Sequence, residues 1–511
     1  MATVAQPVEN PLTEGLERLP VYPTTLVIFG GTGDLAHRKL LPAVYNLAHE
    51  GALPERFNLI AVSRADIPHG DYQGMARESI TKFSRRPPDD QVLEKLLERV
   101  RYVPGTFDDD SVFDRLDQEL KGFDEDAGIV FNRVFYLSTA PAFFPVIVGK
   151  LGAHGLDKVH GADVRVVIEK PFGTRLTEAT ELNHQVLSVL DESQVFRIDH
   201  YLGKETVQNI LAFRFANGMF EPIWNRRYID HVQITVAEKI GIEGRGAFYE
   251  QVGNIRDMIS THLFQVMTFV AMEPPVSFAP DRLRDETVKA LRSTDISSPD
   301  RVIRGQYEGY RDEQGVAPDS TTETFSAMEL DIDNWRWAGV PFFLRTGKGL
   351  TDKMSEITLK FKKVPFNVFR GSDMDLPMRD HLTVRVQPNE GITIGFNVKQ
   401  PGPGMHLGRA AMDFDYDEAF AHTEISDAYE LLLLEAMRGD HSLFIRQDGV
   451  ERAWEILQPV LEHPTPVCFY ERGSWGPPEA EELIRPRKWH VSGVHDAHGY
   501  MSHAYPISKE R

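Results

Sequence analysis

The chain contains very little cysteine. Cys468 is the single cysteine among 511 residues, so an intramolecular disulfide and a metal site built from several cysteines are both excluded. Cys468 lies in the apolar run TPVCFYE, which predicts a buried, small hydrophobic side chain rather than a nucleophile. Because the chain makes no use of disulfides, we expect it to work in the reducing cytoplasm.

Long hydrophobic runs and positive charge are also scarce. No stretch approaches the roughly 18 consecutive apolar residues of a membrane-spanning helix, and the N-terminus lacks a signal-peptide pattern. With 56 Lys and Arg against 76 Asp and Glu, the formal net charge is −20, and such a chain repels polyanions. We therefore expect neither a membrane nor a nucleic acid as partner. An anionic ligand needs a local cluster of Lys, Arg and His.

The apolar pattern predicts two domains after an N-terminal arm. Strand-like runs at 26–29, 57–66, 132–141 and 164–173 alternate with helix-periodic stretches. This pattern predicts an α/β, Rossmann-like domain over 23–198 with a doubly wound parallel sheet. Beyond residue 205, alternating strands such as HLTVRVQPNEGITIGFNVKQ predict a larger α+β domain over 199–511, built on a mostly antiparallel sheet. Residues 1–22, which are polar and contain prolines, are expected to form a mobile arm.

A glycine turn follows the first predicted strand. Gly30 and Gly33 stand between a strand and a helix, where glycines let a pyrophosphate approach the backbone at the helix N-terminus. A tight turn without a ligand stays open as an alternative, because the spacing is not a strict G-x-G-x-x-G. Arg64, at the tip of the second strand, suits the 2′-phosphate of NADP. Nearby Asp66 keeps NAD open as a secondary coenzyme.

Two further polar groups follow apolar strands. Lys170 in EKPFG stands at the carboxyl end of a parallel strand, where ligands of such sheets bind, although a surface lysine before a turn explains it equally well. In FRIDHYLGKE, His200 and Lys204 are four residues apart and would share one face of a helical turn. With Tyr201 they can form a cationic cup for a phosphate. The alternative is a charged helix start capped by Asp199.

A histidine and two acidic residues stand in polar notches of the segment 237–269. Glu238 opens this segment, and Asp257 and His262 follow within an apolar, helix-periodic run. A histidine in such a helix is more often a satisfied core residue than a catalyst. Asp257 and His262 are five residues apart, about 140° around an α-helix, so their spacing alone does not bring them together.

Together these segments resemble the glucose-6-phosphate dehydrogenase family. GGTGDLAHRKL, YLSTAP, IEKPFG, RIDHYLGKE, EGRGAFYEQVGNIRDMISTHLFQ, FFLRTGKGL and YERGSWGPPEAEEL are similar to family segments, in the family's order, across nearly the whole chain. The resemblance implies oxidation of β-D-glucose 6-phosphate at C1 to the 6-phosphoglucono-lactone, with hydride transfer to NADP, in the first oxidative step of the pentose phosphate pathway. It also implies a homodimer or homotetramer, because the large sheet of this family mediates dimerisation.

The resemblance implies roles for individual residues as well. His262 is the expected catalytic histidine, and Asp199 is the acid expected to orient it. The residues expected to bind substrate are Lys170, His200, Tyr201, Lys204, Glu238, Asp257, Lys348 and Lys353. The residues expected to bind the coenzyme are Gly30, Gly31, Thr32, Gly33, Asp34, Leu35, Arg64, Tyr136 and Lys170. Hydride transfer requires no metal, and we expect none.

Departures from the family and rival functions remain. Lys353 stands where the family often carries arginine, which weakens that substrate contact, and Gly31 and Thr32 stand where alanine and serine are frequent. His200 is the rival base, but Lys204 beside a phosphate favours a charged, donating imidazole at that position. A dehydrogenase for an unphosphorylated sugar would not need the phosphate cup. A non-catalytic sensor would bind sugar phosphate and NADP without turnover, and a purely structural protein leaves the polar clusters unexplained.

Overall fold

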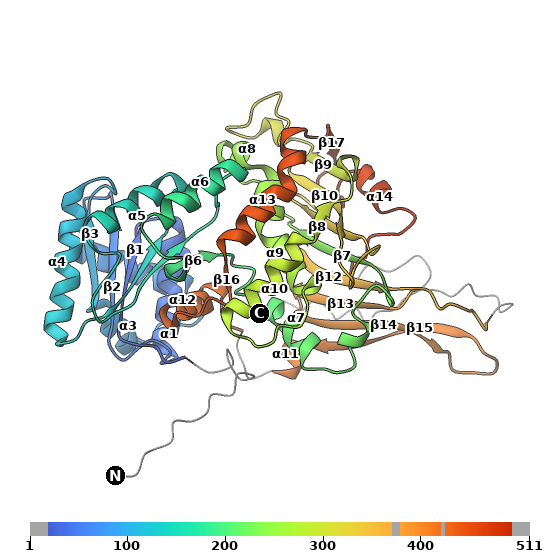
Figure 1. The fold of residues 1–511 in the computed structure, drawn as a ribbon, viewed down its shortest axis with the longest axis horizontal. Helices are drawn as coiled ribbons and strands as arrows, with labels where there is room; N and C mark the ends of the chain where they lie inside the picture. The colour runs from blue at the N-terminus through green and yellow to red at the C-terminus, as the bar shows by residue number, and fades with distance from the viewer. Residues whose placement is uncertain (1–18, 370–378, 421–424, 493–511) are drawn as a thin grey trace, which may run out of the picture. The chain divides into compact units, whose positions relative to one another are not determined.

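The chain folds into two compact units (Figure 1). The computed structural model describes residues 19–369, 379–420 and 425–492, so the predicted arm lies outside the described residues except for 19–22. The first unit takes the described residues up to Glu205, together with Met272–Lys289 and Ile425–Glu455. The second unit takes Thr206–Ala271 and the described residues from Ala290 to 420 and from Ile456 onward.

A seven-stranded sheet with the strand order β16-β6-β5-β4-β1-β2-β3 forms the centre of the first unit. All neighbours from β6 to β3 are parallel, and β16 is antiparallel to β6. The chain runs from β1 outward to β3 and then returns to β4 on the other side of β1, which makes the sheet doubly wound. The strands are β1 (Thr24–Phe29), β2 (Phe57–Ser63), β3 (Val100–Pro104), β4 (Asn132–Leu137), β5 (Val164–Ile168), β6 (Val195–Ile198) and β16 (Phe444–Ile445).

Two sets of helices pack around this sheet. Helix α1 contacts α2, α3 and α12, whereas α5 contacts α4 and α6. Every residue of β1, β2, β4, β5 and β6 is buried, as expected of a parallel sheet covered on both faces. The helices that begin in this unit are η1 (Ala36–Leu40), α1 (Leu41–His49), α2 (His69–Phe83), α3 (Asp90–Leu97), α4 (Asp110–Ala127), η2 (Pro141–Phe143), α5 (Phe144–Ala153), α6 (Leu176–Leu187), η3 (Glu192–Gln194), α7 (Glu205–Phe215), α10 (Pro280–Arg292), α12 (Ala428–Arg438) and α13 (Gln447–Glu462).

Late segments of the chain complete the first unit. Helix α12 begins where the carboxylate of Asp427 accepts the backbone N–H of Tyr429 at 3.0 Å, and it ends at Gly439 with φ 82°. The buried carboxylate of Glu430 accepts hydrogen bonds from Asn46 at 2.7 Å and from Arg85 at 3.0 Å. These contacts fix α12 against α1 and against the chain just after α2, and they place Tyr429 on the first unit.

The second unit is built on a ten-stranded, mostly antiparallel sheet with the order β15-β14-β13-β12-β7-β11-β10-β9-β17, in which β8 also pairs with β10. Two pairs are parallel, β7 with β11 and β9 with β17. The strands are β7 (Ile229–Ala237), β8 (Thr294–Ile296), β9 (Val302–Tyr307), β10 (Phe325–Ile332), β11 (Phe342–Gly347), β12 (Met354–Phe361), β13 (His381–Gln387), β14 (Gly391–Lys399), β15 (Leu407–Asp415) and β17 (Val467–Tyr470). The helices that begin in this unit are η4 (Glu221–Ile223), α8 (Gly246–Asn254), η5 (Ile255–Leu263), α9 (Phe264–Ala271), η6 (Pro299–Arg301), η7 (Tyr310–Asp312), α11 (Tyr416–Ala419) and α14 (Pro478–Ile484).

These two sheets confirm the predicted fold class, a Rossmann-like parallel sheet followed by a mostly antiparallel one. The domain limits at residues 22 and 198 stay predictions. Residues 199–204 do not form the helical turn that we expected. The N–H groups of Leu202 and Lys204 instead bond the carbonyls three residues back, and helix α7 begins only at Glu205.

Cys468 differs from expectation in its burial. It lies on β17, the last strand of the second sheet, and is only partly buried, so the prediction of a buried side chain was wrong. An edge strand leaves one side of the sheet uncovered, which explains the partial exposure. Burial still raises the pKa of the Cys468 thiol, which agrees with the prediction that it is not an activated nucleophile.

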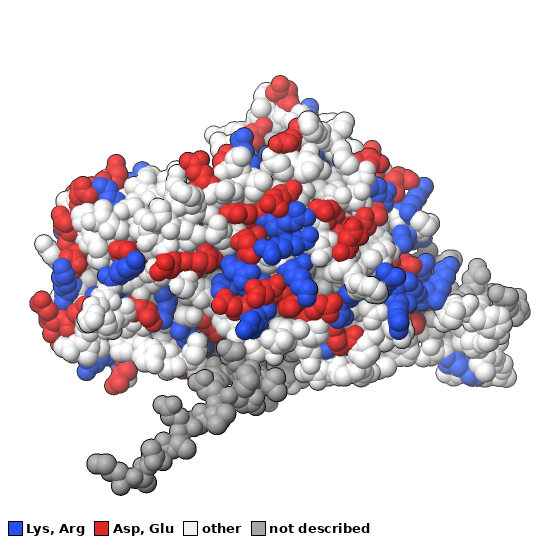
Figure 2. All heavy atoms as spheres, in the orientation of Figure 1, with Lys and Arg blue, Asp and Glu red and all other residues white. Residues whose placement is uncertain are grey.

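Two surface properties bear on the partners. In the part of the chain that the structure describes, no helix is long and apolar enough to cross a membrane. On the face drawn in Figure 2, Lys and Arg side chains are interspersed with Asp and Glu. On this face an anionic ligand would meet charges of both signs rather than a uniformly basic surface.

Candidate functional site

The glycine turn joins β1 to a helical segment that begins at Asp34 and includes Leu35. Gly30 has φ 86°, and a β-carbon there would lie 2.1 Å from the carbonyl oxygen of Ser138. A β-carbon on Gly31 would lie 2.6 Å from that of Ala61. Glycine is therefore required at both positions. The observed turn has the strand–turn–helix geometry in which a pyrophosphate rests on a helix N-terminus.

The end of β2 lies against this turn. The hydroxyls of Thr32 and Ser63 are hydrogen-bonded at 2.6 Å, which ties the turn to the last residue of β2. Arg64 follows directly and is exposed, and it forms no ion pair with any residue that the structure describes. Asp66 is also exposed. The guanidinium of Arg64 is therefore available to a ligand at the carboxyl end of the parallel strands, where such sheets bind dinucleotides.

The carboxyl end of β5 carries Glu169 and Lys170. The Lys170–Pro171 peptide bond is cis, and Lys170 itself is half-buried. The Glu169 side chain is buried and accepts a hydrogen bond from the hydroxyl of Tyr136, which lies on the neighbouring strand β4. Burial raises the pKa of Glu169 to about 7. The predicted residues Tyr136 and Lys170 are thus both neighbours of the Glu169 carboxyl group, Tyr136 through a hydrogen bond and Lys170 along the chain. Glu169 was not among the residues predicted from the sequence.

The phosphate cup predicted from FRIDHYLGKE takes shape in the turns after β6. The ammonium of Lys204 lies 4.3 Å from the centre of the Tyr201 ring, a cation–π contact. The centre of the His200 ring lies 5.2 Å from the centre of the same ring. Turn geometry, rather than a shared helical face, therefore brings His200, Tyr201 and Lys204 together.

Asp199 is placed at the start of these turns. It is buried, and its Oδ1 atom accepts the backbone N–H of Tyr201 at 2.9 Å. This hydrogen bond closes a local turn of the kind that aspartate commonly makes. Asp199 therefore stabilises the turn that carries His200, Tyr201 and Lys204.

In the second unit, Glu238 and Lys348 follow two parallel strands. Ala237 at the end of β7 pairs with Gly347 at the end of β11, so the next residue of each strand lies at the same edge of the sheet. The ammonium of the buried Lys348 forms an ion pair with the carboxylate of Glu238 and lies 5.4 Å from the centre of the Tyr249 ring. The structure thus brings two predicted substrate residues into direct contact.

The segment that carries Asp257 and His262 is a π-helix, η5, rather than an α-helix. In a π-helix each residue bonds the fifth residue along, so residues five apart lie about one turn apart on the same side. The expectation that Asp257 and His262 stand 140° apart was therefore wrong. Gly253, with φ 68°, breaks the preceding helix α8 just before η5 begins. His262 is buried and Asp257 is half-buried.

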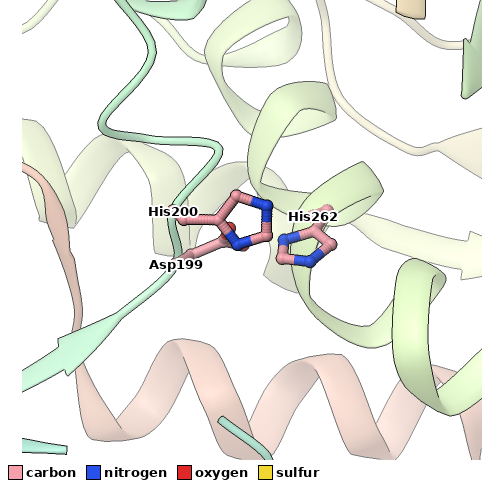
Figure 3. Close-up of side chains that lie close together, drawn as sticks. All are labelled: Asp199, His200 and His262. Atoms are coloured by element: carbon pink, nitrogen blue, oxygen red, sulfur yellow. The ribbon is translucent and has the colours of Figure 1, made fainter. Parts of the chain in front are cut away.

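Figure 3 shows the side chains of Asp199 and His200 on the segment after β6 and that of His262 on η5. Lys353 is exposed and directly precedes β12. Met354 of β12 pairs with Ala237 of β7, so Lys353 lies at the same end of the sheet as Glu238. The sequence analysis missed three residues in these neighbourhoods, Glu169, Tyr249 and Tyr429. Glu169 and Tyr249 lie inside quoted motifs, but neither spacing nor residue type marked them as more than neighbours of charged groups.

Comparison with known proteins identifies the family. The model of the glucose-6-phosphate dehydrogenase NAD-binding domain matches residues 27–209, and that of the C-terminal domain matches residues 211–490. The chain belongs to the glucose-6-phosphate dehydrogenase family. The family and the fold class predicted from the sequence are both confirmed by these matches.

Two individual relatives support the same family membership. Glucose-6-phosphate 1-dehydrogenase 2 of Mycobacterium tuberculosis is 46% identical over 502 residues, covering 94% of this chain and 97% of the relative. The glucose-6-phosphate 1-dehydrogenase of Rhizobium meliloti is 42% identical over 488 residues, covering 91% of this chain and 97% of the relative.

Solved structures show the same similarity. The crystal structure of glucose-6-phosphate 1-dehydrogenase from Mycobacterium avium superposes with a TM-score of 0.81 at 37% identity, covering 93% of this chain and all of that one. A glucose-6-phosphate dehydrogenase in complex with its substrate glucose 6-phosphate superposes with a TM-score of 0.86 at 34% identity, with the same coverage.

Proposed function

We propose that this member of the family oxidises β-D-glucose 6-phosphate at C1 to the 6-phosphoglucono-lactone through the residues described above. Family membership makes the chain a glucose-6-phosphate 1-dehydrogenase, an oxidoreductase that acts on a CH–OH group with NADP as coenzyme. Its reaction is the first oxidative step of the pentose phosphate pathway. The roles of the individual side chains in this reaction are inferred from their chemical properties and contacts.

The observation that supports the substrate best is the cup of His200, Tyr201 and Lys204. A chain with a net charge of −20 repels a sugar phosphate unless cations gather at one place. The cup gathers an ammonium and an imidazole around a phenol. Ammonium and imidazolium donors to phosphate form charge-assisted hydrogen bonds, and in this role the cup selects the phosphorylated sugar over free glucose.

The sugar ring is assigned to the second set of polar residues. The carboxylates of Glu238 and Asp257 accept hydrogen bonds from sugar hydroxyls, and Lys348 donates to a sugar oxygen. The ion pair between Lys348 and Glu238 holds both side chains in place before the substrate arrives. The exposed Lys353 adds a weaker contact.

Proton removal is assigned to His262. Hydride leaves C1 only as the C1 hydroxyl loses its proton, and a neutral imidazole is a suitable base near neutral pH. A carboxylate beside the ring fixes its tautomer and stabilises the imidazolium that forms, which is the role assigned to Asp199. His200 is left to the phosphate, where a charged ring is favourable.

The residues of the first unit fit the coenzyme. Gly30 and Gly31 leave no room for a β-carbon, as a close backbone turn beside a pyrophosphate requires. The guanidinium of Arg64 suits the 2′-phosphate, because its fork binds phosphate oxygens and its plane stacks on adenine. NADP, when bound, accepts the hydride from C1, and Lys170 is assigned a place between the sugar and the coenzyme. NAD stays a secondary coenzyme in this proposal, because Asp66 offers an acceptor for a ribose hydroxyl.

We also propose a homodimer or homotetramer and a cytoplasmic location. Strand β15 ends the order of the ten-stranded sheet, and Met412 on it is exposed, so this edge offers backbone groups and apolar surface to a second copy. Light scattering on the purified protein measures the oligomer. The cytoplasmic location rests on the single cysteine.

The test of the function is reduction of NADP and, separately, of NAD by the purified protein, with glucose 6-phosphate and then with free glucose. We expect rapid reduction with the phosphorylated sugar and a preference for NADP. Equal rates with free glucose would contradict the role of the cup. Binding of both ligands without any reduction would instead support a sensor.

A further inference from the structure

Glu169 sits at a position where its charge can act on the reaction. It directly follows β5, next to Lys170, and only 9% of the residue is exposed. Buried carboxyl groups without partners are rare, because removing a charge from water is unfavourable. The groups that contact Glu169 therefore have to stabilise its carboxyl group in this buried position.

Two tyrosines from distant parts of the chain lie beside the Glu169 carboxyl group. The hydroxyl of Tyr136, on β4, donates to its Oε1 atom, and the charge of the carboxylate acts on Tyr429, on α12. Burial raises the pKa of both tyrosines, so both keep their protons near neutral pH. Tyr429 also lies beside the phosphate cup, with its ring parallel to that of His200 at 6.4 Å.

Two charged groups face the same carboxyl group. On its own segment, Lys170 attracts it through the ammonium and donates its backbone N–H to it. From the turn after β6, Asp199 repels it. The groups around Glu169 are thus Tyr136 from β4, Tyr429 from α12, Lys170 beside it and Asp199 from the neighbouring segment. All four belong to the first unit.

We propose that Glu169 is a positioning residue of the reaction: held by Tyr136, its carboxylate sets the place of the ammonium of Lys170, the next residue of the chain, and the charge balance at Asp199. The inference rests on the roles proposed above for Lys170 and Asp199. Glu169 itself touches neither substrate nor coenzyme in this scheme. It acts through Lys170, the next residue of the chain.

The direction of the pH effect follows from the burial of Glu169. Burial raises its pKa to about 7, so the group is ionised above neutral pH and protonated below it. Above pH 7 the carboxylate attracts the Lys170 ammonium and fixes it. Below pH 7 this attraction disappears, and Lys170 is held only by its backbone and its other contacts.

The variant E169Q tests this scheme because it keeps the shape of the side chain and removes only its charge. The expected result is a kcat lowered about 10- to 100-fold at alkaline pH, since a displacement of about 1 Å at a reacting group costs on the order of 100-fold. The dissociation constant of NADP, measured by fluorescence titration, is expected to rise as well, because Lys170 and Tyr136 are both assigned to the coenzyme. The ratio of wild-type to E169Q kcat/KM is expected to shrink as the pH falls below about 7, where wild-type Glu169 also becomes neutral.

Two companion variants separate positioning from simple structural damage. E169D keeps the charge on a shorter side chain, and we expect it to restore the pH dependence of the ratio in part. E356Q is the matched control, because Glu356 on β12 is also buried and has its pKa raised to about 7 by burial, but belongs to the second unit. We expect E356Q to change the melting temperature without changing the pH profile of kcat/KM.

The outcomes distinguish this inference from the function itself. If the wild-type protein does not reduce NADP with glucose 6-phosphate, the proposed function fails. If the wild type is active and the ratio to E169Q is constant between about pH 6 and pH 9, the positioning role is refuted and the function stands. Should E169Q fail to fold, Y136F removes one hydrogen bond from the same carboxyl group, and its ratio to wild type must also change with pH.

Discussion

Removing the ammonium of Lys204 tests the phosphate cup most directly. Lys204 lies in the turns after β6 with its ammonium 4.3 Å from the Tyr201 ring centre, and its side chain is partly exposed. A hydrogen bond to a charged group contributes about 1.5–3 kcal/mol net, and partial exposure places the loss in the lower part of that range. At about 1.4 kcal/mol per tenfold change, a loss of about 1.5–2 kcal/mol means that K204A should raise the KM for glucose 6-phosphate about 10- to 30-fold.

The assay is steady-state reduction of NADP at saturating coenzyme, with glucose 6-phosphate varied. The kcat is expected to stay within about 3-fold, because Lys204 binds the phosphate equally in the ground state and the transition state. K204R keeps the positive charge, so it should raise the KM for glucose 6-phosphate less than K204A does. Higher ionic strength should narrow the difference between wild type and K204A, since salt screens a partly exposed charge.

A matched control exists in the same unit. Lys82, on α2, also contacts an aromatic ring, with its ammonium 5.2 Å from the centre of the Phe83 ring, but it lies outside the proposed site. K82A should leave the KM for glucose 6-phosphate unchanged. An unchanged KM in K204A, or an equal rise in both variants, would refute the reasoning.

Three further predictions follow from the second unit and the coenzyme turn. H262N should lower kcat at least about 100-fold while the dissociation constant of glucose 6-phosphate, measured by calorimetry, changes little, because the base acts on the proton and not on the phosphate. R64A should raise the KM for NADP far more than that for NAD, and an equal rise would argue against contact with the 2′-phosphate. Burial alone raises the pKa of Asp230, but hydrogen bonds from His231 and Arg487 lower it below its usual range. A lowered pKa stabilises the fold above about pH 4, the unfolded value, and this gain is lost as the pH falls further. D230N should therefore lower the melting temperature at pH 7 and approach wild type below about pH 4, as calorimetry at both pH values would show.

The sequence was sufficient to predict four strands of the parallel sheet, β1, β2, β4 and β5. Fully apolar runs such as those of β1 and β5 are long enough and well enough bounded to predict buried parallel strands. The prediction of Lys170 at the carboxyl end of a parallel strand follows from the same reasoning, whereas Lys348 was expected only from the family resemblance. Residues that directly follow parallel strands meet at one edge of the sheet.

Irregular backbone limited the rest of the prediction. The prediction from spacing assumed the roughly 3.6-residue turn of an α-helix, and the apolar pattern of η5 gave no sign of the wider π-helical turn that brings Asp257 and His262 one turn apart. The turns of 199–204 depend on hydrogen bonds of individual N–H groups, such as that of Tyr201 to Asp199. Sequence spacing does not specify such bonds.

Contacts between segments that are distant in the sequence could not be predicted, for a different reason. Tyr429 is an ordinary residue of an amphipathic helix until α12 packs on α1 and its side chain meets Glu169. A pattern within one segment cannot show which other segment will face it. The same limit applies to Tyr249, whose ring contacts the ammonium of Lys348.

The late segments that complete the first unit also determine when this unit can be finished during synthesis. Strand β16 covers the edge of β6, and Glu430 on α12 takes the hydrogen bonds of Asn46 and Arg85. A ribosome adds about 5–20 residues per second, so α12 and β16 emerge on the order of 10 to 50 s after β6. During that interval the edge of β6 and the bare face of α1 are open to pairing with other chains. Nascent chains that stop before α12 are therefore the ones most exposed to aggregation, and a holdase that covers a strand edge would protect them at this stage.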